Sequence, residues 1–367
     1  MSEVLAARAW WVKLPLSVAY ENALGIIDAF DALVLQLEDE AGCIGWGESC
    51  PVAGYSPETP EEAWEAVPDL MERLLAEGEA SVQAEMDGRF RRQPFVVSLF
   101  REALEDLRGW SGLRLGQPAT LDLLATVNSR DPEEAAAMAR GYLAQGYRTM
   151  KAKVGYDPAA DARRISRLAE VLDGRAILRI DANQGYTAEQ ALAFAKAVPP
   201  EAIEVFEQPV PADAWSDLAA VAAASPLPIM LDESIYDDAD IRRAATLPGI
   251  TAVKLKLSKA GGGAGLVRQM TLAETCGLKV VVGNGVASDL GCLHEAVCCV
   301  QAGLATAGEM NGFMKTPARL TRAVLKMDGP RLLVPPVAAT EVDAAAVERH
   351  THRRIERRAA AAIGRRA

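Results

Sequence analysis

The chain has 367 residues, half of them hydrophobic, and a formal net charge of −11, which suits one barrel of ordinary size plus a smaller domain. The acidic balance excludes nucleic acid as a partner, because phosphate binding needs clustered Lys and Arg. No apolar stretch reaches the ~20 residues of a transmembrane helix, and residues 1–11 lack the apolar centre of a signal peptide. We therefore expect a cytoplasmic protein without a membrane partner.

The N-terminal third predicts a small α+β unit. Residues 3–12 and 31–47 alternate or run apolar as strands do, whereas 60–77 has the periodicity of a helix. A second helical stretch, 98–109, leads into a strand at 121–127. This order of elements predicts a compact unit that precedes a longer repetitive region.

From residue 121 onward, strand-like and helix-like segments alternate. Helix-capping signals separate the apolar runs at three places, Asp131-Pro132, Asp157-Pro158 and Thr187-x-x-Gln190. Later strands are predicted at 250–256, 279–283 and 305–309. Eight strands with helices between them predict a parallel sheet closed as a barrel.

Three carboxylates end three successive apolar runs of this region. Asp181, Glu207 and Asp232 recur about one strand-plus-helix unit apart. Residues at the carboxyl ends of neighbouring parallel strands converge on one face of a barrel, so these acids can share one hard cation. The spacing therefore predicts a magnesium site.

Lysines flank the three acids in the sequence. Lys151 and Lys153 end the strand before the first acid, and Lys254 and Lys256 end the strand after the third. Side-chain direction repeats every two residues in a strand, so each pair shares one face. A neighbouring ammonium and a metal cation both lower the pKa of a lysine. A cation between lysines is suited to stabilise an enolate while protons are moved.

Five motifs carry a resemblance to a known family. They are Thr149-Met-Lys-Ala-Lys-Val-Gly155, Arg179-Ile-Asp-Ala-Asn-Gln-Gly185, Phe206-Glu-Gln-Pro209, Leu231-Asp-Glu-Ser234 and Lys256-Leu-Ser-Lys-Ala-Gly-Gly262. The chain resembles the enolase superfamily, in the muconate lactonizing enzyme subgroup with dipeptide epimerases and N-acylamino acid racemases. Gly45-Trp-Gly-Glu-Ser49 resembles the capping domain of that family, and 332–343 resembles its C-terminal return.

The resemblance implies an α/β fold: a modified TIM barrel, (β/α)7β, with an N-terminal α+β capping domain. We expect residues 1–118 to form the capping domain, 119–325 the catalytic barrel and 326–367 a segment returning to the capping domain. Homo-oligomers are usual for resembling enzymes, so we expect one here. An arginine-rich tail after residue 352 is interpreted as a solvated or subunit-packing helix.

The resemblance also assigns roles to single residues. Lys153 is a base, Lys151 tunes its pKa, and Lys256 acts from the opposite face of the substrate, whereas Lys254 has no assigned role. The cofactor is Mg²⁺, with Mn²⁺ as a substitute, held by the three carboxylates identified above. Two further residues are expected to support these ligands, Asn183 and Glu233.

Residues that contact the substrate are expected on the loops around the barrel mouth. Dipeptide epimerases carry Asp-x-Asp at the end of the eighth strand to hold an ammonium group, whereas this chain has Glu309-Met-Asn311. Muconate lactonizing enzymes have a Glu there, which matches Glu309. Asn284 follows the seventh strand, and the capping segments supply Tyr20 and Tyr55 as further candidates.

The predicted function is abstraction of an α-proton from a carboxylate substrate to give a metal-stabilised enolate, in a racemase or epimerase of an amino acid derivative such as a dipeptide or N-substituted amino acid. A cycloisomerase (muconate-type lactonisation) or a dehydratase using the same lysines is the alternative. Two further classes are a Schiff-base lyase, which would not need three aligned acids, and a non-catalytic binding protein. The run Gly261-Gly262-Gly263 is interpreted as a turn into a helix rather than a phosphate site.

Overall fold

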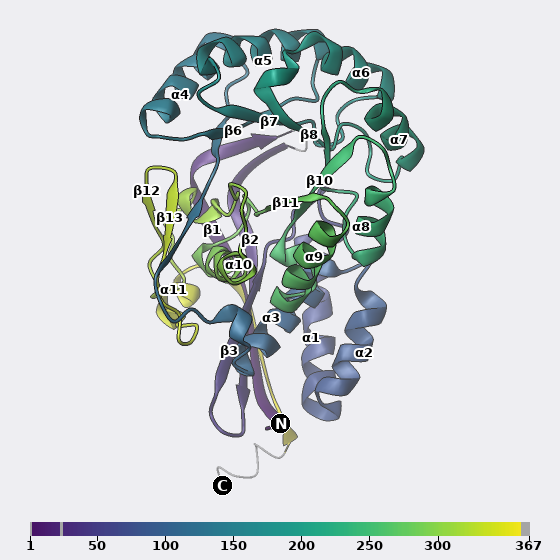
Figure 1. Ribbon diagram of the computed structural model, residues 1–367. Coiled ribbons are helices and arrows are strands. Elements are labelled where there is room, and N and C mark those ends of the chain that lie inside the picture. Colours follow the sequence, from purple (N-terminus) through teal and green to yellow (C-terminus); the bar gives the residue numbers. More distant parts are fainter. Residues whose placement is uncertain (1, 23–24, 361–367) are drawn as a thin grey trace.

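The structure is a computed structural model that describes residues 2–22 and 25–360, with side chains described outside 20–27. An antiparallel sheet forms the N-terminal part (Figure 1). Its strands run in the order β14-β1-β2-β3: β14 (Thr351–Arg358), β1 (Val4–Asn22), β2 (Gly25–Asp39) and β3 (Ile44–Ser49). This sheet confirms the strands that the sequence predicts at 3–12 and 31–47.

Helices cover one face of this sheet, and their bounds are α1 (Pro60–Glu77), α2 (Glu79–Arg89) and α3 (Pro94–Leu107). Helix α1 has the predicted bounds, and Thr59 closes a capping box at its start. Helix α3 packs so closely on β3 that a Cβ on Gly47 would lie 2.2 Å from Leu99 O. Glycine is therefore required at this position of the Gly-Trp-Gly segment.

A curled parallel sheet with the order β11-β10-β9-β8-β7-β6-β5 follows (Figure 1). Its strands are β5 (Ala125–Val127), β6 (Thr149–Lys153), β7 (Ile177–Asp181), β8 (Ile203–Glu207), β9 (Ile229–Leu231), β10 (Ile250–Leu255) and β11 (Lys279–Val282). The helices that follow these strands in turn are α4 (Pro132–Ala144), α5 (Pro158–Leu172), α6 (Ala188–Ala197), α7 (Trp215–Ala224), α8 (Asp238–Ala245), α9 (Gly263–Thr275) and α10 (Asp289–Ala302). The alternation predicted from residue 121 onward is confirmed.

Three of these helices begin at the predicted capping residues. Asp131 accepts hydrogen bonds from the amides of Glu133 and Glu134 at the start of α4, and Asp157 caps α5 in the same way. Thr187 forms its capping box at the start of α6. Side-chain capping satisfies amides that have no partner inside the helix, which is why these positions can be found from sequence.

The strand predicted at 121–127 is divided between two sheets. The amide of Leu123 donates to Pro330 O, whereas the amide of Leu124 donates to Gly308 O. The first half, β4 (Ala119–Asp122), therefore joins an antiparallel sheet in the order β12-β13-β4, with β12 (Lys326–Asp328) and β13 (Arg331–Val334). The prediction of one continuous strand at 121–127 is therefore wrong, because the neighbouring amides of Leu123 and Leu124 bond to different sheets.

The eighth barrel strand predicted at 305–309 is reduced to a bridge. Within the described residues it consists of an isolated parallel bridge between Leu123 and Gly308. Glu309 N donates to Val282 O on the other side. The described sheet is thus a curled half-barrel, and its closure as (β/α)7β stays a prediction.

The arginine-rich tail is a strand rather than the predicted helix. Residues 351–358 form β14 and pair antiparallel with β1, where Arg8 meets Glu356 at 3.2 Å. The edge of β1 offers unpaired backbone groups, and pairing with them outweighs the helix propensity of the tail. Arg365 and Arg366 lie outside the described residues. A short helix, α11 (Ala344–Arg349), precedes β14, and the domain boundaries at 118 and 325 stay predictions.

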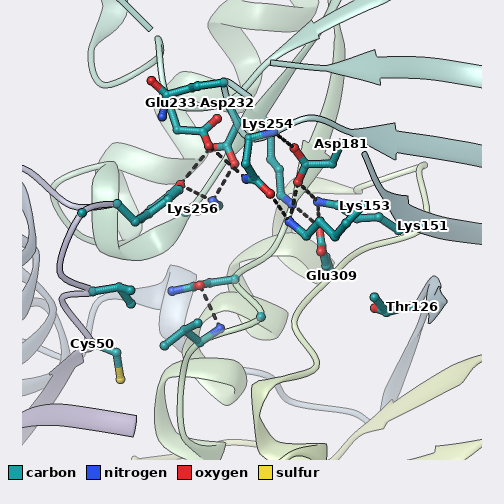
Figure 2. Close-up of a pocket in the computed structure, with 18 of the residues that line it drawn as sticks. Cys50, Thr126, Lys151, Lys153, Asp181, Asp232, Glu233, Lys254, Lys256 and Glu309 are labelled. Atoms are coloured by element: carbon teal, nitrogen blue, oxygen red, sulfur yellow. Dashed lines mark hydrogen bonds and ion pairs between the residues drawn. The ribbon is translucent and has the colours of Figure 1, made fainter. Parts of the chain in front are cut away.

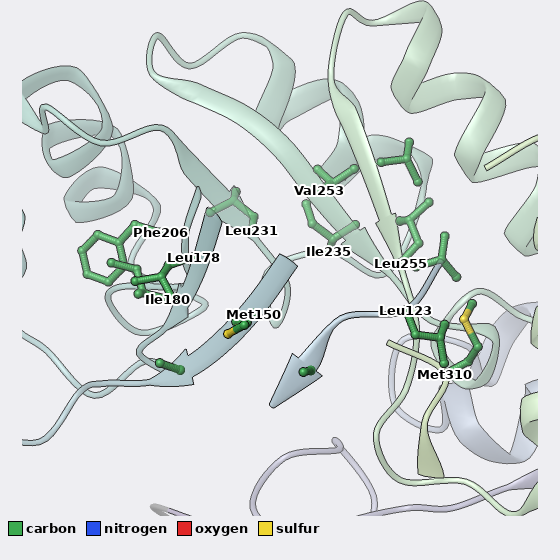
Figure 3. Close-up of a cluster of buried hydrophobic side chains, with 14 of the residues drawn as sticks. Leu123, Met150, Leu178, Ile180, Phe206, Leu231, Ile235, Val253, Leu255 and Met310 are labelled. Atoms are coloured by element: carbon green, nitrogen blue, oxygen red, sulfur yellow. The ribbon is translucent and has the colours of Figure 1, made fainter. Parts of the chain in front are cut away.

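The main hydrophobic core fills the space between the barrel strands and their outer helices. Leu178, Phe206 and Leu231 point outward from neighbouring strands into this layer (Figure 3). Facing the inside of the sheet is a smaller cluster of Val205, Met230, Ala252 and Val281. Strand side chains alternate between faces, so the residues two positions further along also point inward. The polar layer above this apolar floor is where the candidate site lies.

Short 3₁₀ helices complete the described chain: η1 (Ser111–Leu113), η2 (Pro200–Ala202), η3 (Leu257–Lys259) and η4 (Gly312–Met314). None of the helices in residues 2–22 and 25–360 has both the length and the apolar character needed to cross a membrane. The segments around η3 and η4 matter most, because they carry lysines to the mouth of the sheet.

Candidate active site

A pocket opens at the carboxyl ends of the parallel strands (Figure 2). Its walls include the predicted lysines, Asp181 and Asp232, together with Tyr55 and Gly54 from the loop before α1. The structure thus brings these side chains to one cavity, whereas Glu207 lies outside its lining. The N-terminal part closes one side of it.

The end of β6 brings two lysines to Asp181. Lys151 Nζ lies 2.9 Å from Asp181 Oδ2, and Lys153 Nζ lies 2.6 Å from the same oxygen. Lys151 is fully enclosed, whereas the side chain of Lys153 is 21% exposed. Both lysines lie on the predicted strand face, and Lys153 reaches the open part of the pocket. Burial raises the pKa of Asp181, but the lysines outweigh burial and hold it well below its usual range.

Glu207 at the end of β8 lies deeper in the same polar layer. Lys151 Nζ is 2.8 Å from Glu207 Oε2, and Lys254 Nζ is 3.4 Å from Glu207 Oε1. Despite the nearby ammonium, Glu207 Oε2 accepts no well-aligned hydrogen bond. Burial and the charge of Asp181 raise the pKa of Glu207. A buried oxygen in this condition is suited to receive a cation.

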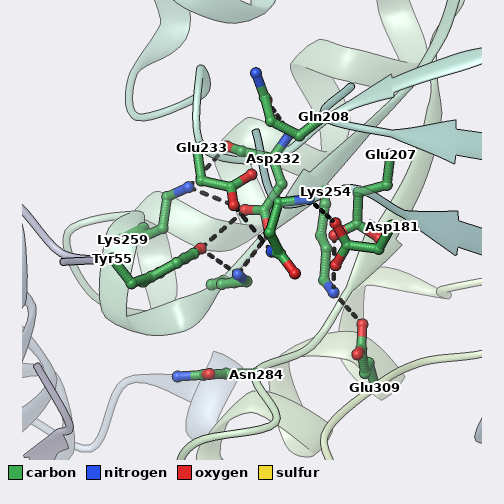
Figure 4. A network of polar contacts seen from close by, with 12 residues as sticks. Tyr55, Asp181, Glu207, Gln208, Asp232, Glu233, Lys254, Lys259, Asn284 and Glu309 are labelled. Carbon is green, nitrogen blue, oxygen red and sulfur yellow. Dashed lines mark hydrogen bonds and ion pairs between the residues drawn. The ribbon is translucent and has the colours of Figure 1, made fainter. Parts of the chain in front are cut away.

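Lys254, to which the sequence assigned no role, pairs with Glu309 (Figure 4). Glu309 Oε2 also lies 3.1 Å from Lys151 Nζ. Lys254 is 2% exposed, so this ion pair lies inside the sheet rather than at the pocket rim. Burial raises the pKa of Glu309, but the two lysines outweigh it and lower that pKa below its ordinary value. Alternation along β10 places Lys254 above Ala252 of the apolar floor.

Asp232 follows β9 and is the centre of a second charged group. Lys256 Nζ lies 2.7 Å from Asp232 Oδ2, and Lys259 Nζ lies 3.1 Å from Oδ1. Tyr55 Oη donates to Asp232 Oδ1 at 3.0 Å and is also bonded to Lys256. Burial lowers the pKa of Lys256, but Asp232 and Glu233 outweigh burial and raise it.

Asn183 and Glu233 lie beside the acids, as the resemblance implies. Asn183 Oδ1 accepts from Lys153 Nζ at 2.6 Å, and its Nδ2 donates to Glu233 Oε1 at 3.0 Å. Glu233 Oε2 is buried without a hydrogen-bond partner. Burial, with a smaller contribution from Asp232, raises the pKa of Glu233 to about 7. These two side chains link the β7 end to the β9 end of the pocket.

Gln208 is a positioning residue that the sequence reasoning missed. Its Oε1 accepts from the amides of Asp232 and Ser234 at 3.1 and 3.2 Å, and its Nε2 donates to Val210 O and Ser234 Oγ. The side chain is fully buried, and the backbone φ is +36°. Gln208 therefore holds the start of the Asp232 segment against the end of β8. Its place beside Glu207 in the Phe-Glu-Gln-Pro motif was the available signal.

The predicted substrate contacts divide into three groups. Tyr55, Asn284 and Glu309 line the pocket, although Tyr55 and Glu309 are engaged by buried lysines. Asn284 donates to Ser258 Oγ at 3.3 Å and accepts from Val286 N. Asn311 is buried beside Gly285, outside the set of lining residues. The side chain of Tyr20 lies outside the described residues.

The donor set fits a hard divalent cation. Asp181, Glu207 and Asp232 end adjacent strands, are each 1% exposed and offer only oxygen ligands, the chemistry that Mg²⁺ prefers. Within the described residues, no three His, Cys, Asp or Glu side chains already converge as metal ligands. Lysine ammonium groups lie against these carboxylates instead. The metal site therefore stays a prediction, supported by the buried Glu207 oxygen that accepts no hydrogen bond.

The amides at the end of the glycine run after Lys259 already have a carboxylate partner. Glu105 from α3 accepts hydrogen bonds from Gly263 N at 2.7 Å and from Ala264 N at 3.1 Å. These amides begin α9, where a phosphate would otherwise bind. The interpretation as a turn into a helix agrees with this arrangement.

Comparison with known proteins identifies the family. Residues 134–337, more than half of the chain, match the family model described as enolase C-terminal domain-like. The chain belongs to the enolase superfamily. It is 32% identical over 299 residues to the L-Ala-D/L-Glu epimerase of Bacillus subtilis (strain 168), covering 76% of this chain and 80% of that protein. Its relatives are isomerases, and this enolase-superfamily chain is one as well.

Two further similarities show whether the relatives of this chain share one substrate. The chain is 31% identical over 302 residues to the L-Lys-D/L-Arg epimerase of Methylococcus capsulatus, covering 78% of this chain and 84% of that protein. The crystal structure of N-succinyl Arg/Lys racemase from Bacillus cereus ATCC 14579 has a TM-score of 0.87 at 23% identity, covering 97% of this chain and 100% of that chain. Relatives of nearly equal identity thus differ in substrate, so the substrate has to be inferred from this pocket.

Proposed function

We propose that this enolase-superfamily chain is a Mg²⁺-dependent racemase or epimerase of an N-substituted amino acid or dipeptide. The observation that carries the proposal is the placement of Lys153 and Lys256. Lys153 ends β6 and Lys256 follows β10, with three strands between them in the curled sheet, and both line the same pocket. Two proton carriers on different walls can serve the two faces of one planar carbon.

The proposed magnesium ligands are the carboxylates of Asp181, Glu207 and Asp232. When bound, the cation supplies positive charge that offsets the negative charge gained by a carboxylate substrate on losing its α-proton. Lys153 and Lys256 now pair with two of the three acids, at 2.6 and 2.7 Å. These two carboxylates would hold the cation in this proposal, and the proton steps would fall to the two lysines.

The lysines carry the proton steps in this proposal. The neutral Nζ of one lysine accepts the α-proton, and the C–H electron pair moves into the substrate carboxylate. The ammonium of the other lysine then donates a proton to the opposite face of the same carbon. Lys151, which is buried and bonded to acids, stays charged, and its ammonium repels that of Lys153 on the same strand face, which favours release of a proton there. Tyr55 closes the Lys256 side and limits access of water.

The test is incorporation of deuterium from D₂O at the α-carbon, measured by mass spectrometry and chiral chromatography with and without Mg²⁺. Candidate substrates are dipeptides, N-acyl and N-succinyl amino acids, and unsaturated diacids. Exchange with inversion supports a two-base racemase or epimerase. Loss of water or ring closure would replace this proposal by a dehydratase or cycloisomerase, and covalent trapping by borohydride without Mg²⁺ would indicate a Schiff-base lyase.

A further inference from the structure

Lys315 contributes another cation to the pocket, from the segment that follows η4. Its Nζ donates to Gly285 O at 2.7 Å, and the residue lines the same cavity as Lys153 and Asn284. A Cβ on Gly285 would lie 2.8 Å from Lys315 Nζ. The glycine therefore leaves space for the ammonium group against the pocket wall. Neither the predicted proton transfer nor the predicted metal site uses this lysine.

The charges around the pocket favour anions. Its lining has more lysines than acids: Lys151, Lys153, Lys254, Lys256 and Lys315 against Asp181, Asp232, Glu233 and Glu309. Glu207 and Lys259, which contact these residues, add one charge of each sign. A divalent cation would increase the positive excess by two more charges. The α-carboxylate of a substrate neutralises one charge, so positive charge remains for a second anion.

Among the described side chains at the end of the sheet beside Lys315, the acid is Glu309, and it is already engaged. Glu309 is bonded to Lys151 and Lys254 and is 8% exposed. The second polar residue of this segment, Asn311, is neutral. Among the described side chains, a substrate ammonium near Lys315 would find no unengaged carboxylate, which costs electrostatic free energy. This arrangement disfavours a free α-amino group at that end of the pocket.

We propose that Lys315 is a specificity-determining residue that binds a second carboxylate of the substrate, distal to the α-carbon. This inference rests on the proposed function and specifies its substrate class. Two sources share the chemistry: an N-carboxyacyl group such as succinyl, and the acidic side chain of a dipeptide. The neutral amide of an N-acyl substituent suits the segment at Glu309 better than an ammonium group does.

Equilibrium binding tests the proposal separately from turnover. Calorimetry with Mg²⁺ present would compare N-succinylglycine with its neutral amide, N-succinamoylglycine, and L-Ala-L-Glu with L-Ala-L-Gln. The glycine ligands return unchanged after any proton exchange, so their affinity is measured without accumulation of product. The proteins are wild type, Lys315→Met, and the matched control Lys326→Met, whose side chain is exposed on β12. A second variant, Gly285→Ala, pushes Nζ from its place and leaves the charge intact.

We expect wild type to prefer one charged ligand over its neutral partner by about ten- to a hundredfold, the range for a hydrogen bond to a charged group. Lys315→Met should abolish this preference, Gly285→Ala should reduce it, and Lys326→Met should keep it. Whichever pair shows the preference identifies the source of the second carboxylate.

Three results would overturn the role of Lys315: no preference for either charged ligand in wild type, a preference that survives in Lys315→Met, or equal loss of affinity for charged and neutral ligands. The last would indicate a merely structural side chain. Selective binding through Lys315 without deuterium exchange on any substrate would refute the proposed racemase or epimerase and leave the carboxylate site standing. The two proposals therefore fail on different measurements.

Discussion

Replacing Gln208 with Met should unfold the protein at markedly lower denaturant concentration. The two side chains are unbranched and similar in size, so the positive φ of +36° disfavours both alike. Methionine cannot accept the hydrogen bonds that Gln208 Oε1 takes from Asp232 N and Ser234 N. Each buried N–H left without a partner costs about 1–3 kcal/mol, so the two together should lower the free energy of unfolding by about 2–6 kcal/mol.

Equilibrium unfolding in urea, followed by circular dichroism, measures this difference. The matched control is Gln145→Met, because Gln145 is exposed at the end of α4 and its side-chain Nε2 donates to Gly141 O at 3.3 Å. The control should change the free energy of unfolding by less than about 0.5 kcal/mol. If Gln208→Met lowers the free energy of unfolding by no more than the control does, the claim that this side chain holds the β8 and β9 ends together is refuted.

Four other predictions concern packing, pH, catalysis and the metal. Gly47→Ala should lower the free energy of unfolding by about 2 kcal/mol or more, because the new Cβ would lie 2.2 Å from Leu99 O. In the control Gly88→Ala, the Cβ on α2 has open space, so thermal unfolding should show an unchanged or raised stability. Burial raises the pKa of the Glu105 carboxyl to about 7, so the folded state binds this proton more tightly than the unfolded state does. The free energy of unfolding should therefore fall by up to about 3 kcal/mol as the pH rises from 4.5 to 7. Glu105→Gln should reduce this pH dependence, as measured by denaturant titrations at several pH values. Lys256→Met should lower inversion at least about a hundredfold, within the range of acid–base catalysis, but keep α-deuterium exchange with one enantiomer; equal loss with both would contradict the two-base scheme. Asp181→Asn should reduce the rise in melting temperature that Mg²⁺ gives to wild type, and an undiminished rise would remove Asp181 from the metal site.

The sequence determined the alternation of strands and helices and the residues that meet at the sheet mouth. Helix starts at Asp131, Asp157 and Thr187 were predictable because a capping side chain acts within three residues of its own position. The placement of Asp181, Glu207 and Asp232 at the ends of adjacent strands was predictable for a related reason. Ends of neighbouring parallel strands must meet, whatever the helices between them contain.

Only the tertiary structure decided which partner each segment and each charge would take. The tail at 351–358 became a strand because the edge of β1 needed backbone partners, and the run at 121–127 was divided because Leu123 and Leu124 donate to different sheets. Likewise, Lys254 and Lys315 are ordinary lysines in the sequence, and nothing local distinguishes the buried partner of Glu309 from the cation beside Gly285. Burial and charge pairing arise from residues far apart in the chain, so their energies exist only once the sheet has curled around the pocket.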